Sequence, residues 1–202
     1  AIMYVAKKCG IKEIINVGWA QAIASLAYIQ KVNKIIGPGN IYVAGAKRKV
    51  FGDVGIEGMI AGPSEITVLA DKKTDLNEVT TSMIGQAEHD ENSQCILVSK
   101  DKLLIKKVIK RINIILKKIP RKLIASKSLK KNGLIIYVNE DKKIPEIINL
   151  ISPEHLEINV KKPNKYLKKI VNAGSICIGR YSAMAVTDYT AGINHVLPTL
   201  GS

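Results

Sequence analysis

The sequence predicts an α/β fold with doubly wound, mostly parallel sheets made of Rossmann-like βαβ units. Short apolar runs rich in Ile, Leu and Val alternate with helical patterns along all 202 residues. Aromatic residues make up only 4% of the chain, so aliphatic side chains must form the core. Strands that alternate with helices form crossover connections, and these connections give parallel sheets covered by helices.

The first third of the chain predicts short elements separated by glycines. We expect helices over residues 2–8, 20–28 and 41–51 and strands over residues 13–17 and 32–36. Gly10 ends the first helix, and the turn Gly37-Pro38-Gly39 separates the second strand from the third helix. Basic residues near the end of that helix complement its dipole.

The middle of the chain contains one clear βαβ unit followed by a long amphipathic helix. We expect strands over residues 66–70 and 94–98 and helices over residues 75–88 and 102–119. Thr74 is a plausible N-cap, and Asp75 falls in the first turn, where negative charge is favourable. The long helix carries one apolar stripe at helical spacing and ends at Pro120.

The last third predicts shorter elements and then a loop. We expect strands over residues 134–138, 156–159 and 175–178, a helix over residues 145–150, and a helix from Pro163 that closes at Ala173-Gly174. The tail from Arg180 shows neither helical nor strand periodicity. No linker-like composition marks a boundary, and we divide the chain approximately into residues 1–60 and 61–202.

The composition excludes several classes of protein. No apolar stretch is long enough for a transmembrane helix, and the N-terminus shows no secretory signal. The net charge is +14, but only four of the 31 basic residues are Arg, the usual reader of bases and phosphates. We therefore attribute the charge to solvated Lys and expect no nucleic-acid partner; a basic nucleic-acid-binding protein is the least favoured alternative.

The cysteines indicate a reducing compartment. Cys9, Cys95 and Cys177 are far apart and form no C-x-x-C pair, which excludes a zinc site built from cysteines. Cys95 and Cys177 lie in apolar, strand-like runs. We expect free buried thiols in a cytoplasmic protein.

Two pairs of polar residues could carry chemistry. Gln86 and His89 are spaced i, i+3 near the end of a predicted helix, a spacing that suits two ligands of one metal but also a histidine that caps the helix. Glu154 and His155 are adjacent, and a neighbouring carboxylate and imidazole can share acid and base work, although they can also be a chance pair. Ligands of doubly wound folds bind beyond the carboxyl ends of strands, so we expect the site there.

Further candidates lie in loops. Asp188 and His195 belong to a polar, glycine-containing tail, where Asp188 could be an oxygen ligand of a metal or part of an Asx turn. Asn40 closes a Gly37-Pro38-Gly39 turn at a helix N-terminus, which favours an anion, but the spacing is not that of a dinucleotide fingerprint. Ser64 lacks the context of a catalytic triad.

Taken together, five segments in order resemble the histidinol dehydrogenase family. They are INVGWAQAIASLAY, GPGNIYVAGAKRKVFGDVGIEGMIAGPSEITVLAD, GQAEHDENSQCILVS, SPEHLEI and DYTAGINHVLPT. The resemblance extends over essentially all 202 residues. It implies a zinc-dependent homodimer that oxidises L-histidinol to L-histidinaldehyde and then to L-histidine with two molecules of NAD, the last two steps of histidine biosynthesis.

The resemblance also implies roles for single residues. Gln86, His89 and Asp188 would bind Zn2+, which would hold the amine and imidazole of the substrate. Glu154 and His155 would be the catalytic pair: His155 would accept the alcohol proton, and Glu154 would activate the water that adds to the aldehyde. Three other residues would make binding contacts, namely Ser64 with the substrate and Gln21 and Asn40 with NAD. His195 would be a residue of the pocket.

The chain departs from the family in several respects. The family is about twice as long, and the resemblance implies that an N-terminal part is missing, together with a C-terminal region that donates a zinc-binding histidine and a substrate-binding glutamate across the dimer. Trp19 replaces a glycine, and the stretch from Tyr28 to Lys31 is a few residues short. We expect the 202 residues alone to bind zinc weakly and to show little or no turnover. The alternative is a non-catalytic remnant that acts at most as a binding module.

Overall fold

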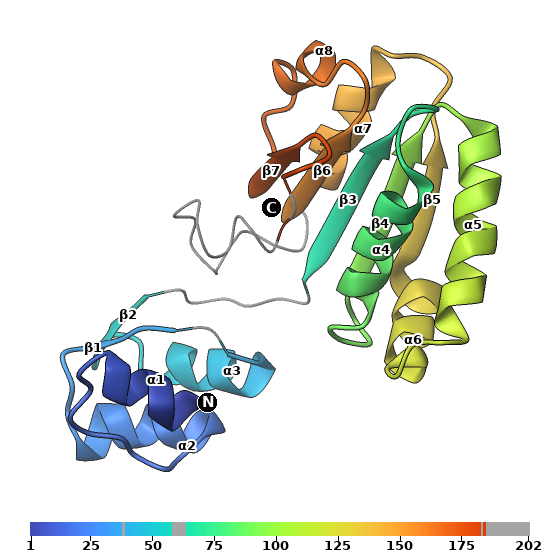
Figure 1. Cartoon of the computed structure of the whole chain (residues 1–202). Helices are drawn as coiled ribbons and strands as arrows, with labels where there is room; N and C mark the ends of the chain where they lie inside the picture. Colours follow the sequence, from blue (N-terminus) through green and yellow to red (C-terminus); the bar gives the residue numbers. More distant parts are fainter. Residues whose placement is uncertain (38, 58–63, 183, 185–202) are drawn as a thin grey trace. The chain divides into compact units, whose positions relative to one another are not determined.

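The computed structural model describes residues 1–37, 39–57, 64–182 and 184 (Figure 1). The chain forms two compact units, Ala1–Met59 and Ile60–Ser202. Among the described residues, no helix is long and apolar enough to cross a membrane.

The first unit is small and mostly helical. Its elements are α1 (Ile2–Lys8), α2 (Trp19–Ala24), which continues into the π-helical turn η1 (Ser25–Ile29), β1 (Lys34–Ile35), α3 (Ile41–Lys49) and β2 (Gly55–Ile56). The two short strands pair in parallel. A small cluster of buried aliphatic side chains holds the unit together: Ile23, Ile35, Val50 and Val54.

One predicted strand of this unit is wrong. Residues 13–17 have no regular secondary structure and are exposed. A strand requires a neighbour that satisfies its main-chain hydrogen bonds, and none of the described residues pairs with this segment. The local alternation of apolar residues was therefore not sufficient to form a strand.

The second unit contains a parallel sheet, as the sequence predicts. Its strands are β3 (Glu65–Ala70), β4 (Gln94–Ser99), β5 (Gly133–Tyr137), β6 (His155–Asn159) and β7 (Ser175–Ile178). They lie in the order β5–β4–β3–β6–β7, and every neighbouring pair is parallel. The chain thus adds two strands on one side of β3 and then two on the other, which is the doubly wound topology.

Helices cover both faces of this sheet (Figure 1). On one face lie α4 (Leu76–Ala87), α5 (Lys102–Leu116) and α6 (Lys122–Asn132), and on the other lie α7 (Lys143–Ile151) and α8 (Asn164–Leu167). Each face has its own buried cluster: Val68 and Leu97 pack with Val108 of α5. Leu69 and Leu156 pack with Ile148 of α7. Both faces are buried under helices, which explains why the strand sequences are continuous apolar runs.

Several predictions in this unit need correction. Asp75, not Thr74, is the N-cap of α4, and its side chain accepts a hydrogen bond from the main-chain N–H of Asn77 at 2.7 Å. The Thr74 hydroxyl donates instead to the carbonyl of Asn159. The helix predicted from Pro163 to Ala173 is only the short α8. The sequence did not predict α6, which begins two residues after the helix-breaking Pro120.

The cysteines are free thiols, as predicted. Cys95 and Cys177 are buried, whereas Cys9 is exposed. The Cys95 thiol donates to the carbonyl of Met83 at 3.2 Å, and burial raises its pKa to about 12. This thiol is therefore a core group rather than a nucleophile.

Candidate active site at the amino ends of the strands

Three of the segments singled out in the sequence meet at one edge of the parallel sheet. Ser64 comes directly before β3, the stretch from Gln86 to His89 leads into β4, and Glu154 and His155 open β6. Because β3 lies between β4 and β6, the three segments are neighbours. They lie at the amino ends of the strands, so the expectation of a site beyond the carboxyl ends is wrong for these residues.

The main chain of Glu65 anchors both members of the candidate acid–base pair. Its N–H donates to Oε2 of Glu154 at 2.8 Å, and its carbonyl oxygen lies 3.1 Å from Nδ1 of His155. Glu154 is only 6% exposed, and the imidazole of His155 lies 3.6 Å from its carboxylate. The main chain of one residue at the start of β3 therefore holds two side chains that stand about ninety residues further along the chain.

This geometry gives the two nitrogens of His155 different roles. A carbonyl oxygen only accepts hydrogen bonds, so the contact with Glu65 requires a proton on Nδ1. In the neutral ring, Nε2 then carries the lone pair and is the atom that can accept a proton. The arrangement can therefore perform proton transfer at His155 with a carboxylate beside it.

Gln86 and His89 lie at the carboxyl end of α4. The main-chain N–H of His89 donates to the carbonyl of Gln86 at 3.2 Å, so the two residues share the last turn. Gln86 is buried, and its side-chain nitrogen has no hydrogen-bond partner among the described residues. His89 is exposed. Neither hydrogen bonds nor packing within the described chain explain why an amide should be buried here.

These two side chains fit part of a cation site. The carboxyl end of a helix carries partial negative charge, and the last turn of α4 contains no Lys or Arg that would neutralise it. An imidazole nitrogen is a usual zinc ligand, and Gln86 in the same turn carries an amide oxygen, which is the amide atom that binds a cation. The described residues hold no group of three or more His, Cys, Asp or Glu placed for a metal. Asp188, the third predicted ligand, lies outside them, as does His195.

Ser64 joins the turn that carries His89 (residues 89–93, called the metal turn below) to the start of β3. Its carbonyl accepts the main-chain N–H of Gln94 at 3.1 Å, so the loop that follows His89 begins β4 directly beside Ser64. The side chain of Ser64 is half-buried. The predicted substrate contact, the metal turn and the acid–base pair thus lie along one edge of the second unit.

The predicted NAD contacts lie in the first unit. Asn40 is the N-cap of α3, where its Oδ1 accepts the main-chain N–H groups of Tyr42 and Val43, each at 3.1 Å. This use of the side chain fixes the start of the helix. Lys47 is buried and donates to the carbonyl of Gly37, and burial lowers its pKa. Gln21 lies exposed on α2.

Trp19 has an unfavourable backbone conformation. Its φ is +60°, which is a left-handed conformation that glycine adopts easily and a bulky residue does not. The indole is 62% exposed, and its ring centre lies 5.9 Å from that of Tyr42. The structure thus places a strained aromatic residue close to the start of α3, at a position where the resemblance implies a glycine.

Sequence reasoning missed the role of Glu65. The only local signal is an acidic residue that opens an otherwise apolar strand, and this residue is buried. Its contribution comes from its main chain, which no side-chain pattern can indicate.

Comparisons with known proteins agree with the motifs. The sequence model of the family described as "Histidinol dehydrogenase" matches residues 1–202. The chain is 57% identical over 206 residues to the histidinol dehydrogenase of Pelagibacter ubique, covering 100% of this chain and 48% of the relative. It is 47% identical over 205 residues to that of Bacillus subtilis, again covering 100% and 48%.

A solved structure shows the same fold. The crystal structure of histidinol dehydrogenase from Elizabethkingia anophelis superimposes with a TM-score of 0.89 and 37% identity, over 98% of this chain and 46% of that one. The chain therefore spans about half the length of the relatives that it matches.

Proposed function

This chain belongs to the histidinol dehydrogenase family, and from that premise we propose that it carries the acid–base centre of an enzyme that oxidises L-histidinol. The reaction converts the primary alcohol to L-histidinaldehyde and the aldehyde to L-histidine. NAD accepts one hydride in each step. The single observation that carries the proposal is the attachment of Glu154 and His155 to one residue, Glu65.

His155 serves the first oxidation. Its Nδ1–H is held by the carbonyl of Glu65, so its Nε2 is the ring atom that takes the proton of the substrate hydroxyl as a hydride leaves the carbon that bears this hydroxyl. Loss of the proton and of the hydride leaves a C=O bond, NAD would supply the hydride acceptor when bound, and the proton stays on the imidazole until it passes to solvent.

Glu154 serves the second oxidation. Its carboxylate is held by the N–H of Glu65 beside the imidazole, where it can remove a proton from water as the oxygen adds to the aldehyde. Loss of a hydride from the resulting hydrate gives the carboxylic acid. The two residues thus divide two proton transfers between them.

Other residues supply the proposed contacts with the metal, the substrate and NAD. Gln86 and His89, together with Asp188, would hold Zn2+, which when bound positions the amine and imidazole of the substrate. Ser64 would contact the substrate. Gln21 and Asn40 would contact NAD. We place the protein in the cytoplasm as a homodimer, with no nucleic-acid or membrane partner.

The proposal is tested by the formation of NADH from L-histidinol with added zinc. The assay compares the 202-residue chain with a version extended by its native flanking sequence. Activity of the extended version alone supports the proposal and the expectation that this chain turns over little by itself. If both versions fold and neither forms NADH, the catalytic proposal fails.

Two variants of the extended version separate the two steps. His155→Asn removes the proton acceptor, and we expect at least a hundredfold loss of alcohol oxidation. Glu154→Gln keeps the size and one acceptor atom, so the alcohol should still react while oxidation of added L-histidinaldehyde falls by a similar factor. Equal losses in both half-reactions for both variants would contradict this division of work.

One observation favours the second candidate, a non-catalytic remnant. Trp19 stands in a left-handed backbone conformation near the predicted NAD contacts, at a position where the resemblance implies a glycine, and its indole takes up room beside the nucleotide. The assay on the extended version also decides this point, because a remnant folds without forming NADH.

A further inference from the structure

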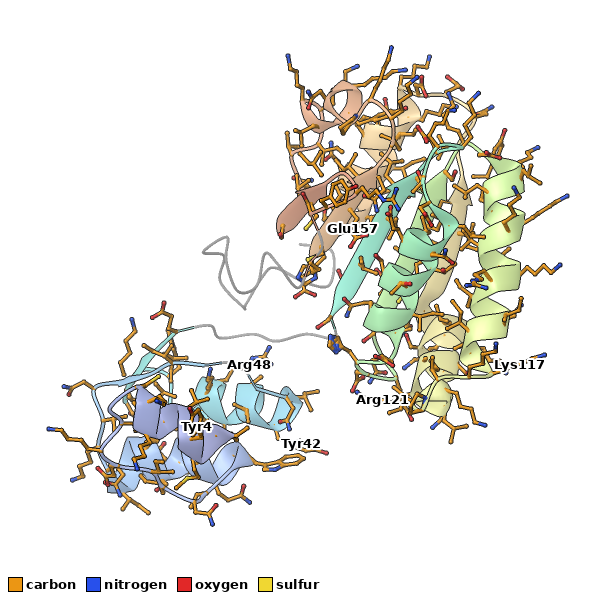
Figure 2. All side chains as sticks on the ribbon, in the orientation of Figure 1. Tyr4, Tyr42, Arg48, Lys117, Arg121 and Glu157 are labelled. Carbon is orange, nitrogen blue, oxygen red and sulfur yellow. The ribbon has the colours of Figure 1, made fainter. Side chains whose placement is uncertain are left out.

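The turn that carries His89 is held from outside by α6. Arg121, the N-cap residue of α6, donates from Nη2 to the carbonyl of His89 at 3.3 Å (Figure 2). The hydroxyl of Ser128 donates to the carbonyl of Ser93 at 2.8 Å. The N-cap and the middle of α6 therefore contact the two ends of the turn 89–93.

The middle of the turn is held in the same way. The side-chain amide of Asn132 donates to the carbonyl of Asn92 at 2.9 Å, and Lys131 donates to the side-chain oxygen of Asn92 at 2.8 Å. Lys127 forms an ion pair with Glu91 at 2.8 Å. Donors from α6 and its N-cap thus reach three of the main-chain carbonyls of the turn, at His89, Asn92 and Ser93.

The turn needs this support because its own bonds are few. Asp90 accepts the main-chain N–H of Asn92 at 2.8 Å, and its carbonyl accepts the N–H of Ser93 at 3.1 Å. These bonds close the turn locally but do not fix its position against the sheet. Ser128 does so, since it is fully buried and its donor has no water to replace the carbonyl of Ser93.

We infer that α6 is the positioning element of the metal turn: Arg121, Ser128 and Asn132 fix the main chain of residues 89–93 and thereby the place of the His89 imidazole. The inference rests on the proposed function, in which His89 is a ligand. Outer-shell groups that orient a ligand typically change metal affinity 10- to 100-fold when they are removed. On this inference, some of the basic side chains of α6 and its N-cap hold the turn in place and are not merely solvated.

A matched pair of variants tests the inference on the 202-residue chain. Arg121→Ala and Lys122→Ala each remove one exposed positive charge at neighbouring positions, and of these two residues Arg121 is the one that donates a hydrogen bond to the turn. Ser128→Ala removes a buried donor without changing the charge, and Arg121→Lys retains a donor. Hydrogen exchange of the amides of residues 88–94 is measured without metal, and Zn2+ affinity is measured by competition with a chromophoric chelator.

We expect faster exchange confined to this segment in Arg121→Ala and Ser128→Ala, and unchanged exchange in Lys122→Ala. The affinity for Zn2+ should fall about tenfold in the first two variants and recover in Arg121→Lys. If exchange of the turn is the same in all variants and in the unsubstituted chain, the inference is wrong. Exchange that rises over the whole sheet would also overturn it, because the residues would then be general structural contacts.

The two measurements, hydrogen exchange and Zn2+ affinity, test the inference and the proposed function separately. Failure of the unsubstituted chain to bind Zn2+ would count against the metal site, whereas the exchange of residues 88–94 decides the positioning role of α6 by itself.

Discussion

Glu157 is a carboxylate that is buried in β6. It is 6% exposed and receives a hydrogen bond from the side-chain amide of Asn159 at 3.2 Å (Figure 2). Burial raises its pKa, and the negative charge of Glu78 adds to the effect, whereas hydrogen bonds from Ser82 and Asn159 oppose it. The ionised form is therefore less favourable in the folded chain than in the unfolded chain.

The isosteric substitution Glu157→Gln should stabilise the protein at neutral pH. Because the folded pKa is raised, this group contributes stability at acid pH and loses it as pH rises through the folded pKa. Gln retains an acceptor for Asn159 without a charge, and we expect a gain on the order of 1 kcal/mol in the free energy of unfolding at neutral pH. Denaturant unfolding at neutral pH and at about pH 4 measures it; a gain that is equal at both pH values would contradict the explanation.

Trp19 allows a second prediction at the scale of one residue. A left-handed φ costs a residue other than glycine roughly 1–2 kcal/mol. Trp19→Gly and Trp19→Ala both remove the indole, but only Gly relieves the backbone. We expect the Gly variant to be more stable than the Ala variant by about 1 kcal/mol, measured by thermal unfolding. Equal stability of the two variants would show that the backbone at this position is not strained.

At the scale of elements, side-chain donors and acceptors decide where helices and loops are attached. Asp141, just before α7, accepts hydrogen bonds from Lys100 at 2.6 Å, from the hydroxyl of Tyr166 at 3.0 Å, and from Lys165. The end of β4 and the helix α8 are thus tied to one carboxylate. Its bonds with Lys100 and Lys165 hold the pKa of Asp141 well below its usual range.

This depressed pKa predicts a specific sensitivity to acid. A carboxylate whose pKa is lower in the folded state contributes stability above its unfolded pKa and loses it as pH falls toward the folded value. The contribution of Asp141 should therefore be present above about pH 4 and fade below it. Asp141→Asn should be less stable than the unsubstituted chain at neutral pH but lose less on acidification. Acid titrations followed by circular dichroism test this, and parallel curves would refute it.

The elements also show which local signals the sequence carries. The amphipathic stripe of α5 predicted that helix from its start but extended it to residue 119, beyond its end at Leu116, whereas α6 was missed. Its buried positions, Ala125 and Ser128, are small or polar, so no apolar stripe marks the helix. The helix is instead fixed by packing on α4 and β4 and by its contacts with the turn 89–93. Such contacts are tertiary and leave no periodic signal.

At the scale of the whole molecule, the two units differ in how well they bury apolar surface. The first unit has a small buried cluster and exposes many large apolar side chains: Ile2, Met3, Tyr4, Val5, Ile11, Ile14, Ile15, Val17, Trp19, Tyr28, Ile29, Ile36, Ile41, Tyr42 and Phe51. The second unit buries both faces of its sheet. Each of these buried clusters draws its residues from one unit.

We expect the two units to unfold in separate transitions, with the first at lower temperature. Stability follows buried apolar area, which is much smaller in the first unit. Trp19, the single tryptophan, reports on this unit alone, whereas circular dichroism also follows the helices of the second unit. Tryptophan fluorescence should therefore change before most of the ellipticity is lost. Coincident transitions would show that the units unfold as one.

The sequence by itself determined the fold class, most of the elements and the family. Alternation of apolar runs with helical periodicity is a local property, and the motifs around Gln86, Glu154 and their neighbours are contiguous strings. The tertiary structure alone decided that Ser64, the turn at His89 and the Glu154–His155 pair meet at the amino edge of the sheet. It alone assigned the main chain of Glu65 and the helix α6 their roles. Hydrogen bonds between groups about ninety residues apart depend on strand order and register, and no local pattern of side chains specifies either.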